Sequence, residues 1–139
     1  MMLGARSLLS RFMADESVIR ETIENYWKTF SAGDRDAWVA LFTDDATVED
    51  PVGTPVHRGK EAIGEFWDTA HSLADSIELR SLSITPIVGN EAAFAMEIRP
   101  NIGGATFVME AIDVMTFADD GRITSQRAFW QQEKMRPAD

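Results

Sequence analysis

The sequence predicts an α+β domain in which helices pack on one face of an antiparallel sheet. Apolar residues at helical spacing dominate the first half of the chain, whereas alternating strand patterns separated by turn sequences fill the second half. This segregation of helices from hairpins is typical of α+β domains. The 139 residues suffice for one domain, and no internal repeat or linker divides them.

Three helices are expected in the first half of the chain. The first follows Asp15, whose side chain is suited to cap a helix, and it ends at Gly33. Its apolar residues recur at intervals of three and four positions: Val18, Ile19, Ile23, Tyr26, Trp27 and Phe30. Asp34 is expected to cap a short second helix that continues to Phe42, and a third helix with one apolar face spans residues 60–73.

Strand patterns account for most of the remaining chain. Residues 46–50 alternate between apolar and polar side chains, and residues 51–59 form a loop because prolines and glycines interrupt them. Turn sequences rich in Gly, Asn and Asp separate four further expected strands, at residues 76–88, 91–99, 105–117 and 122–132.

The first 13 residues differ in composition from the rest of the chain. They contain two arginines and no acidic residue, whereas residues 14–139 carry all 23 acidic residues. We expect residues 1–13 to be a disordered N-terminal extension and residues 14–139 to form a single domain. A transit-like arm, or a start codon upstream of the true one, are the alternatives.

Charge and composition exclude several classes of partner and site. With a net charge of -10, the protein is expected to bind neither nucleic acid nor a membrane surface. Without cysteine it has no disulfide, thiol nucleophile or thiolate metal site, which is compatible with the expected cytoplasmic location. His57 and His71 lack the spacing of metal ligands, so we expect both at the surface and no bound metal.

Two aspartates, Asp50 and Asp113, fall in apolar rows of expected strands. The row of Asp113 follows from the side-chain period of two and contains Phe107, Met109, Ala111, Met115 and Phe117. A buried carboxylate must be paired or must take up a proton. Three outcomes are therefore open for Asp113: an ion pair with Arg99 or Arg127, a bulge that turns it to solvent, or a protonated state in a cavity.

Tyr26 is the only tyrosine of the chain, and it lies on the apolar face of the first expected helix. That position suits a core aromatic residue, and it equally suits a hydroxyl donor in a site.

Three segments, read together with the positions of Tyr26, Asp50 and Asp113, carry a common pattern: residues 31–34 with 39–53, residues 112–117 with 121–123, and residues 90–95. The first of these resembles the second helix, first strand and base loop of bacterial ketosteroid isomerases. The second resembles the strand that carries the second essential aspartate of these enzymes, and the third resembles one of their hairpin strands. These enzymes belong to the SnoaL-like, nuclear transport factor 2-like superfamily. The separations between the three named residues also match those of the family.

The resemblance implies both a fold and an activity. The fold would be a curved, antiparallel-rich sheet that forms a cone around an apolar pocket, with three N-terminal helices on its concave side, in a homodimer. The activity would be that of a steroid Δ-isomerase, without cofactor or metal, which moves a double bond from Δ5 to Δ4 in a 3-oxosteroid. Asp50 would be the general base, and Tyr26 and protonated Asp113 would donate hydrogen bonds to the dienolate oxygen.

The expected ligand is small, flat and apolar, and steroid-like in shape. We expect its pocket to be lined by Phe30, Phe66, Met96, Met109, Ala111, Met115, Ala128 and Trp130, of which Trp130 matches an aromatic residue common in the isomerases. Trp67 is a departure, because those isomerases carry at this position a tyrosine that supports the oxyanion-hole tyrosine. An indole donates but does not accept a hydrogen bond, so the support of Tyr26 must differ.

Three other functions compete with the isomerase. A SnoaL-type polyketide cyclase or lyase would handle a proton with one aspartate and needs no protonated acid. A limonene-type epoxide hydrolase would need an arginine between two aspartates, for which Arg99 or Arg127 would have to serve. A non-catalytic small-ligand-binding dimer module would need none of these groups. The complete set of Tyr26, Asp50 and Asp113 favours the isomerase.

Overall fold

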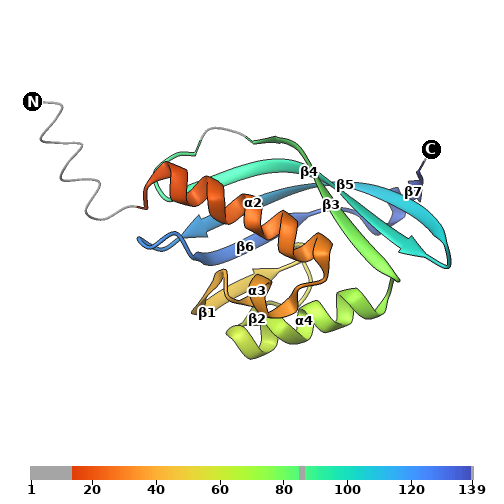
Figure 1. Cartoon of the computed structure of the whole chain (residues 1–139), viewed down its shortest axis with the longest axis horizontal. Helices are drawn as coiled ribbons and strands as arrows, with labels where there is room; N and C mark the ends of the chain where they lie inside the picture. The colour runs from red at the N-terminus through yellow and green to blue at the C-terminus, as the bar shows by residue number, and fades with distance from the viewer. Residues whose placement is uncertain (1–13, 85–86, 139) are drawn as a thin grey trace, which may run out of the picture.

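The computed structural model describes residues 14–84 and 87–138. The expected disordered extension, residues 1–13, lies outside the described residues. The described chain forms three α-helices and a seven-stranded sheet, with the helices on one side of the sheet (Figure 1). The predicted α+β class is therefore confirmed.

The first helix has the boundaries that its capping residues indicate. α2 (Glu16–Ala32) follows Asp15, whose carboxylate accepts a hydrogen bond from the backbone nitrogen of Ser17 at 2.8 Å. It ends at Gly33, which adopts the left-handed conformation with a φ of 72°. Glycine adopts this conformation without a steric penalty, so the chain can reverse here toward the next helix.

The second helix is shorter than predicted. α3 (Arg35–Val39) ends before Phe42, which instead begins β1 (Phe42–Glu49). The reason is tertiary: β1 pairs in parallel with a strand near the other end of the chain, and Ile123 N donates to Leu41 O at 2.8 Å. Local periodicity does not register such a partner. α4 (Lys60–Ser72) agrees with the third predicted helix.

The sheet has the strand order β2-β1-β6-β5-β4-β3, and β7 pairs with β5. Its remaining strands are β2 (His57–Arg58), β3 (Ser76–Ile84), β4 (Glu91–Ile102), β5 (Ala105–Phe117), β6 (Ile123–Phe129) and β7 (Arg136–Pro137). All neighbours are antiparallel except β1 and β6. The last predicted strand ends early, at Phe129, and is followed by the 3-10 helix η1 (Gln132–Lys134).

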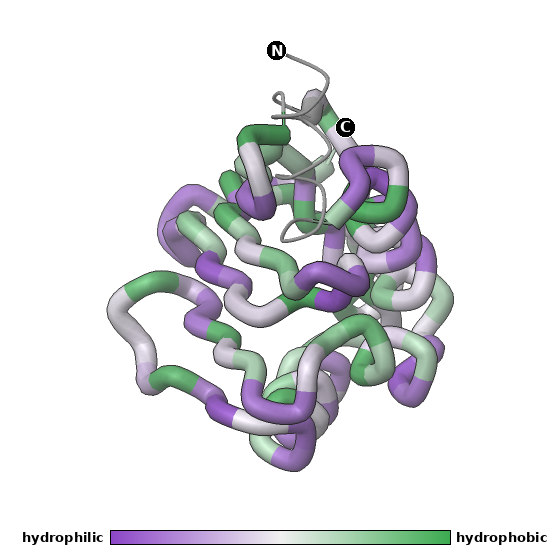
Figure 2. The backbone as a smooth tube through the Cα atoms, turned by 90° about the vertical axis from the view of Figure 1, so that its left-hand side faces the viewer, coloured by the Kyte–Doolittle hydropathy of each residue, from purple (hydrophilic) through white to green (hydrophobic). Residues whose placement is uncertain are grey.

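The sheet is curved, and the core fills its helical side. Register shifts interrupt the β3–β4 and β5–β6 ladders, and such irregularities bend strands. The long strands β4 and β5 extend across the molecule (Figure 1). α2 packs along β3, and α4 packs against β1. Hydrophobic and hydrophilic residues alternate along the strands (Figure 2), so one set of side chains faces this core.

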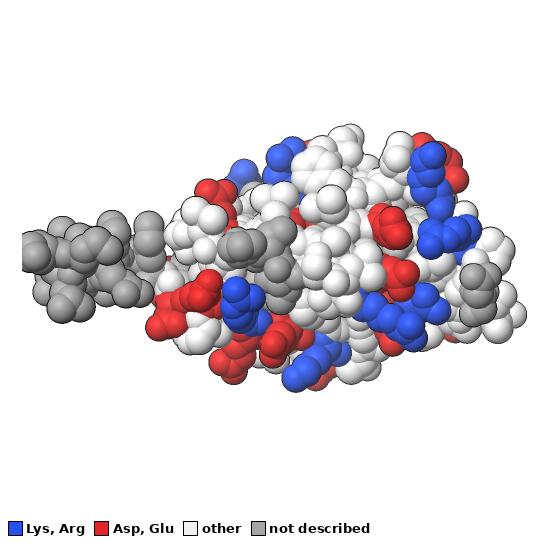
Figure 3. All heavy atoms as spheres, turned by 90° about the horizontal axis from the view of Figure 1, so that it is seen from above, with Lys and Arg blue, Asp and Glu red and all other residues white. Residues whose placement is uncertain are grey.

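Acidic and basic side chains are interspersed on the face that Figure 3 shows from above. The described residues form no basic stripe on this face. Several pairs are exposed, such as Arg35 with Asp68 and Arg122 with Asp120, each at 2.8 Å. No helix in the described part of the chain is long and apolar enough to cross a membrane.

Candidate active site

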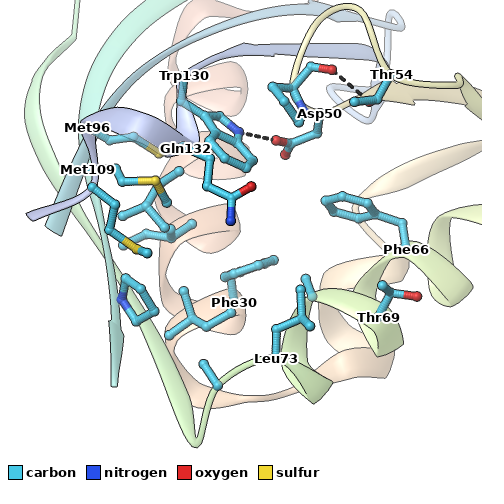
Figure 4. Close-up of a pocket in the computed structure, with 18 of the residues that line it drawn as sticks. Phe30, Asp50, Thr54, Phe66, Thr69, Leu73, Met96, Met109, Trp130 and Gln132 are labelled. Atoms are coloured by element: carbon cyan, nitrogen blue, oxygen red, sulfur yellow. Dashed lines mark hydrogen bonds between the residues drawn. The ribbon is translucent and has the colours of Figure 1, made fainter. Parts of the chain in front are cut away.

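A cavity of about 410 Å³ lies between α2, α4, the β3–β4 hairpin and the segment after β6. Most of its lining is apolar, and the polar exceptions are Tyr26, Asp50, Thr54, His57, Thr69 and Gln132. Figure 4 shows Asp50, Trp130 and Thr54 at one end and Leu73 at the opposite end. An apolar hollow with a few polar groups at one end suits a largely apolar ligand that carries a polar group at that end.

Asp50 stands at the cavity wall, directly after β1 and before a cis peptide bond to Pro51. Its Oδ1 accepts a hydrogen bond from Trp130 Nε1 at 2.5 Å, and its Oδ2 accepts one from Gln126 Nε2 at 3.3 Å. Burial raises the pKa of Asp50, while these two donors and the nearby His57 oppose that rise. Asp50 is therefore a half-buried carboxyl group whose two oxygens both have donors.

Asp113 is fully buried, with an exposed fraction of 0%. Its Oδ2 accepts a hydrogen bond from Gln126 Nε2 at 3.1 Å, and its Oδ1 has no hydrogen-bond partner among the described residues. Burial raises the pKa of Asp113 well above its ordinary value, and the negative charge of Asp50 raises it further. Both causes favour the neutral, protonated carboxyl group.

The structure decides between the three outcomes that the sequence left open for Asp113. The ladder is regular here, with Asp113 opposite Phe94 on β4 and Ala128 on β6, so there is no bulge. Arg99 pairs with Glu97 and Glu78, and Arg127 pairs with Glu49 at 2.9 Å, so neither arginine neutralises Asp113. The remaining outcome was a protonated acid in a cavity: burial favours the protonated form of Asp113, but Asp113 does not line the cavity.

Tyr26 approaches the two aspartates from the helical side of the cavity. Its side chain is 2% exposed, and it lines the cavity from α2. Burial raises the pKa of Tyr26 well above its ordinary value, and the charges of Asp113 and then Asp50 add to this rise. Among the described residues its hydroxyl makes no hydrogen bond, so this donor is available to a ligand.

Aromatic packing supports the Tyr26 ring. The ring centroid lies 5.8 Å from that of Trp38, 6.2 Å from that of Phe30 and 6.5 Å from that of Phe42. Trp67 packs instead against Phe30 and stacks on another ring, that of His71, at 3.8 Å. Tyr26 is thus positioned by ring contacts, which is the different form of support that the tryptophan at position 67 required.

The predicted lining residues divide into two groups. Five of them line the cavity: Phe30, Phe66, Met96, Met109 and Trp130. Three do not: Met115 and Ala128 are fully buried in the core, and Ala111 is buried and borders a separate hollow. Asp113 itself is not a lining residue, and its link to the cavity wall runs through Gln126 to Asp50.

Both histidines were expected at the surface, and the structure leaves both only partly exposed. His57 is half-buried and lines the cavity, with its ring 5.2 Å from that of Phe66. His71 is half-buried against Trp67, within reach of two backbone carbonyl groups. Among the described residues, no group of three or more His, Cys, Asp or Glu side chains is arranged to hold a metal ion.

Gln126 is the functional residue that the sequence reasoning missed. It is fully buried on β6 and donates to both aspartates. The period of two places Gln126 on the same face as the buried Ala128 but also as Thr124, so the argument that singled out Asp113 gives a weaker signal here. A buried amide on such a face calls for partners as a buried carboxylate does.

Comparison with known proteins places this site in a family. The model of the SnoaL-like domain matches residues 23–126. The chain belongs to the SnoaL-like family. It is 40% identical over 112 residues to a steroid Δ-isomerase of Nocardioides simplex, which covers 81% of this chain and 89% of that protein. The predicted relationship to steroid Δ-isomerases is confirmed.

Solved structures of this family share the fold. The Δ5-3-ketosteroid isomerase of a Mycobacterium species has a TM-score of 0.77 at 25% identity, covering 87% of this chain and 98% of that one. SalBIII, an epoxide hydrolase/cyclase-like enzyme of pyran ring formation in the polyether salinomycin, has a TM-score of 0.80 at 27% identity, covering 89% and 98%. The predicted conical SnoaL-like fold is confirmed by these likenesses.

Proposed function

We propose that the protein is a steroid Δ-isomerase that moves a C=C double bond from Δ5 to Δ4 in a 3-oxosteroid or a similar β,γ-unsaturated ketone. The observation that carries this proposal is the pair of aspartates with different surroundings, of which one lines an apolar cavity and the other is linked to it through Gln126. Asp50 receives two donors and lines the cavity, while Asp113 is fully buried and its pKa is raised well above the ordinary value. The relationship to the Nocardioides simplex isomerase supports the same reaction.

Asp50 acts as the general base. It removes a proton from the carbon between the ketone and the double bond, and the C–H electron pair forms a dienolate whose negative charge lies on oxygen. The protonated Asp50 then returns the proton to the far alkene carbon, so one carboxyl group serves both transfers and nothing else is consumed. The N–H donors of Trp130 and Gln126 hold the carboxylate ionised and oriented before the reaction.

Tyr26 and Asp113 stabilise the dienolate oxygen. Tyr26 lines the cavity and has a free hydroxyl, so it is placed to donate directly. We assign the second donation to Asp113 Oδ1, the carboxyl oxygen without a partner among the described residues. This assignment requires the substrate oxygen to reach beyond the wall that Tyr26 forms, since Asp113 does not line the cavity. Preorganised donors of this kind act strongly in a dry site.

The cavity suits a flat apolar skeleton. Its walls are made by aromatic and thioether side chains, those of Phe30, Phe66, Met96, Met109 and Trp130. The end opposite Asp50 is formed by Leu73 and other apolar residues, so a ligand would place its ketone at the aspartate end and its hydrocarbon body across the cavity.

Incubation with a Δ5-3-ketosteroid tests this function through the ultraviolet absorption of the conjugated product. We expect conversion by the wild-type protein and a loss of kcat of about 10²–10⁴-fold in Asp50→Asn, because the base is removed. Asp45→Asn changes an exposed aspartate of the same strand and is the matched control. Absence of conversion across a range of such ketones, with steroid binding retained, would support the non-catalytic module instead.

A cyclase or lyase of the SnoaL type is the second candidate, and the likeness to SalBIII favours it. An epoxide hydrolase with an arginine between two aspartates has less support, because Arg99 and Arg127 pair with glutamates and neither lines the cavity. If the protein opens or cyclises an epoxide substrate and leaves Δ5-3-ketosteroids unchanged, the second candidate replaces the first.

We further propose a homodimer formed through the outer face of the sheet. Leu82, Ala95, Ile112 and Phe129 come from four neighbouring strands and border one hollow, and Ile112 is 52% exposed. Burying such a face against a second copy would remove this apolar surface from water. Light scattering should report a dimer for the wild type and a monomer for Ile112→Lys, whereas Val88→Lys, at an exposed position outside this hollow, should remain dimeric.

A further inference from the structure

Gln126 occupies the space between the two aspartates on the inner face of the sheet. On β6 it lies opposite Met115 of β5 and Val48 of β1. Asp113 and Asp50 are each two residues away from those positions, so all three polar side chains belong to the same face. The order of the strands therefore brings one amide to two carboxyl groups.

Both hydrogens of the Gln126 amide nitrogen are used by these carboxyl groups. Nε2 lies 3.1 Å from Asp113 Oδ2 and 3.3 Å from Asp50 Oδ2. The opposite amide orientation would turn Oε1 toward the same two oxygens and repel an ionised Asp50. In the observed orientation Oε1 is buried and has no partner among the described residues. A buried acceptor without a partner is costly, so a methionine of similar shape would suit a purely structural role better.

The two carboxyl groups differ in the number of donors that they receive. Asp50 accepts one N–H from Gln126 and another from Trp130. Among the described residues, Asp113 accepts one hydrogen bond, from Gln126 on Oδ2. Hydrogen-bond donors favour the ionised form of a carboxyl group, so the group with two donors ionises first. An N–H held on Asp113 Oδ2 makes that oxygen the acceptor and leaves Oδ1 as the atom that carries the proton.

We propose that Gln126 is a positioning residue that holds Asp50 as the anion and, by occupying Oδ2 of Asp113, directs the proton of that acid to Oδ1. This inference deepens the proposed isomerase function and rests on it for its kinetic readout. The other titratable groups around the pair are Tyr26 on α2, His57 on β2 and the outward-facing pair of Glu49 with Arg127. Among the described residues, only Gln126 bonds to both carboxyl groups.

Gln126→Met tests the proposal because it removes the N–H donors and keeps an unbranched side chain. Loss of a donor raises the pKa of each aspartate. The acid limb of kcat/KM, where the base must be ionised, should therefore move to higher pH by about one to two units, given a hydrogen bond to a charged group. An alkaline limb due to Asp113, which must stay protonated, should move in the same direction. A mere loosening of the site would lower the rate and leave both limbs in place.

The matched control is Thr124→Val, which removes a polar group from the same strand without touching either aspartate. Its pH profile should be that of the wild type. Carbon-13 NMR of labelled aspartate carboxyl groups, assigned with Asp50→Asn and Asp113→Asn, measures the same two pKa values without any substrate. If Gln126→Met does not fold, Gln126→Asn keeps the amide but shortens its reach, and its profile should shift in the same direction by a smaller amount.

Unchanged limbs and unchanged NMR titrations in the folded variant would overturn the role of Gln126 even though isomerisation is observed. Conversely, a wild-type protein that converts no ketosteroid would contradict the proposed function, while a shift of the two NMR titrations would still establish the role of Gln126. The two proposals therefore fail through different observations.

Discussion

At the scale of single residues, Asp50 and Asp113 show how identical side chains acquire different chemistry from their neighbours. Asp50 lies at the cavity wall and receives two N–H donors, whereas Asp113 is fully buried and receives one. Burial raises the pKa of both groups, and the charge of Asp50 raises that of Asp113 further. Position in the sheet therefore underlies the different roles that we propose for the two groups.

The raised pKa of Asp113 gives a signed prediction for stability. The folded state binds this proton more tightly than the unfolded state, so stability falls as pH rises from the ordinary aspartate value toward the raised one. Asp113→Asn removes this dependence. The Tm difference, variant minus wild type, should therefore increase between pH 4 and pH 8, as followed by thermal unfolding. Asp119→Asn, an exposed aspartate in a turn, is the control, and an equal trend there would contradict the assignment.

Tyr26→Phe should separate activity from stability. The hydroxyl makes no hydrogen bond to the described residues, so its removal leaves the aromatic packing of the ring intact. We expect Tm to change little and kcat for a Δ5-3-ketosteroid to fall by about 10²–10³-fold, the usual effect of losing one oxyanion donor. Steady-state kinetics and calorimetry measure the two quantities. A large loss of Tm with a small loss of kcat would show that the hydroxyl has a structural role.

Prediction of single residues from the sequence succeeded where a polar side chain falls in a row of apolar side chains on one face of a strand. Asp113 stands out in an apolar strand, and its burial follows from the period of two. Gln126 and His57 were missed because an amide in a short strand and a histidine in a segment expected to be a loop conflict less obviously with their surroundings. Their roles depend on which strands become neighbours, which is not a local property.

At the scale of elements, caps and turns set where α2 lies. The Gly121 turn packs against this helix: Thr22 Oγ1 donates to Gly121 O at 2.9 Å, and a Cβ at Gly121 would overlap the side chain of Val18. The glycine also has a φ of 88°. Both conditions favour glycine at this position.

Gly121→Ala should therefore destabilise the protein more than Gly103→Ala. Gly103 also has a positive φ, of 62°, but a Cβ there would meet no atom within 4 Å. We expect about 1–2 kcal/mol from the backbone at both positions and about 1–3 kcal/mol more from the overlap at Gly121. Urea unfolding measures the difference, and equal free energies of unfolding would show that α2 accommodates the added methyl group.

Element boundaries were predictable where local chemistry sets them. The cap of Asp15 and the stop at Gly33 are local, and both match α2. The start of β1 at Phe42 is not, because it depends on parallel pairing with β6. The curvature of the sheet depends on register shifts within the β3–β4 and β5–β6 pairs, which the alternation of apolar residues does not reveal, so it entered the sequence analysis only through the family resemblance.

At the scale of the whole molecule, the cavity wall and the hydrophobic core share residues. Phe30 lines the cavity, yet it is nearly buried and its ring contacts those of Trp67 at 5.0 Å and His71 at 4.6 Å. Leu73 lines the other end, but it is 71% exposed. The cavity therefore has a wall, at Phe30, on which the fold depends. It also has an exposed rim, at Leu73, on which the fold does not depend.

Phe30→Ala and Leu73→Ala should differ accordingly. We expect Phe30→Ala to lower the free energy of unfolding by about 3–5 kcal/mol, as usual for a buried aromatic residue, and Leu73→Ala to lower it by about 0.5 kcal/mol or less. Leu73→Ala should still change the kcat/KM ratio for two ketosteroids that differ at the end far from the ketone. Urea unfolding and competition kinetics measure these effects, and similar losses of stability would contradict the division.

This division has a consequence for how the protein could diversify. Lineages that drift toward new ligands would accumulate replacements around Leu73, where each trial leaves the scaffold intact. Replacements behind Phe30 would need a compensating change elsewhere before they could persist, because the same ring holds two aromatic neighbours in place. Sequence variation among descendants should therefore concentrate around Leu73, whereas the residues around Phe30 should change slowly and together.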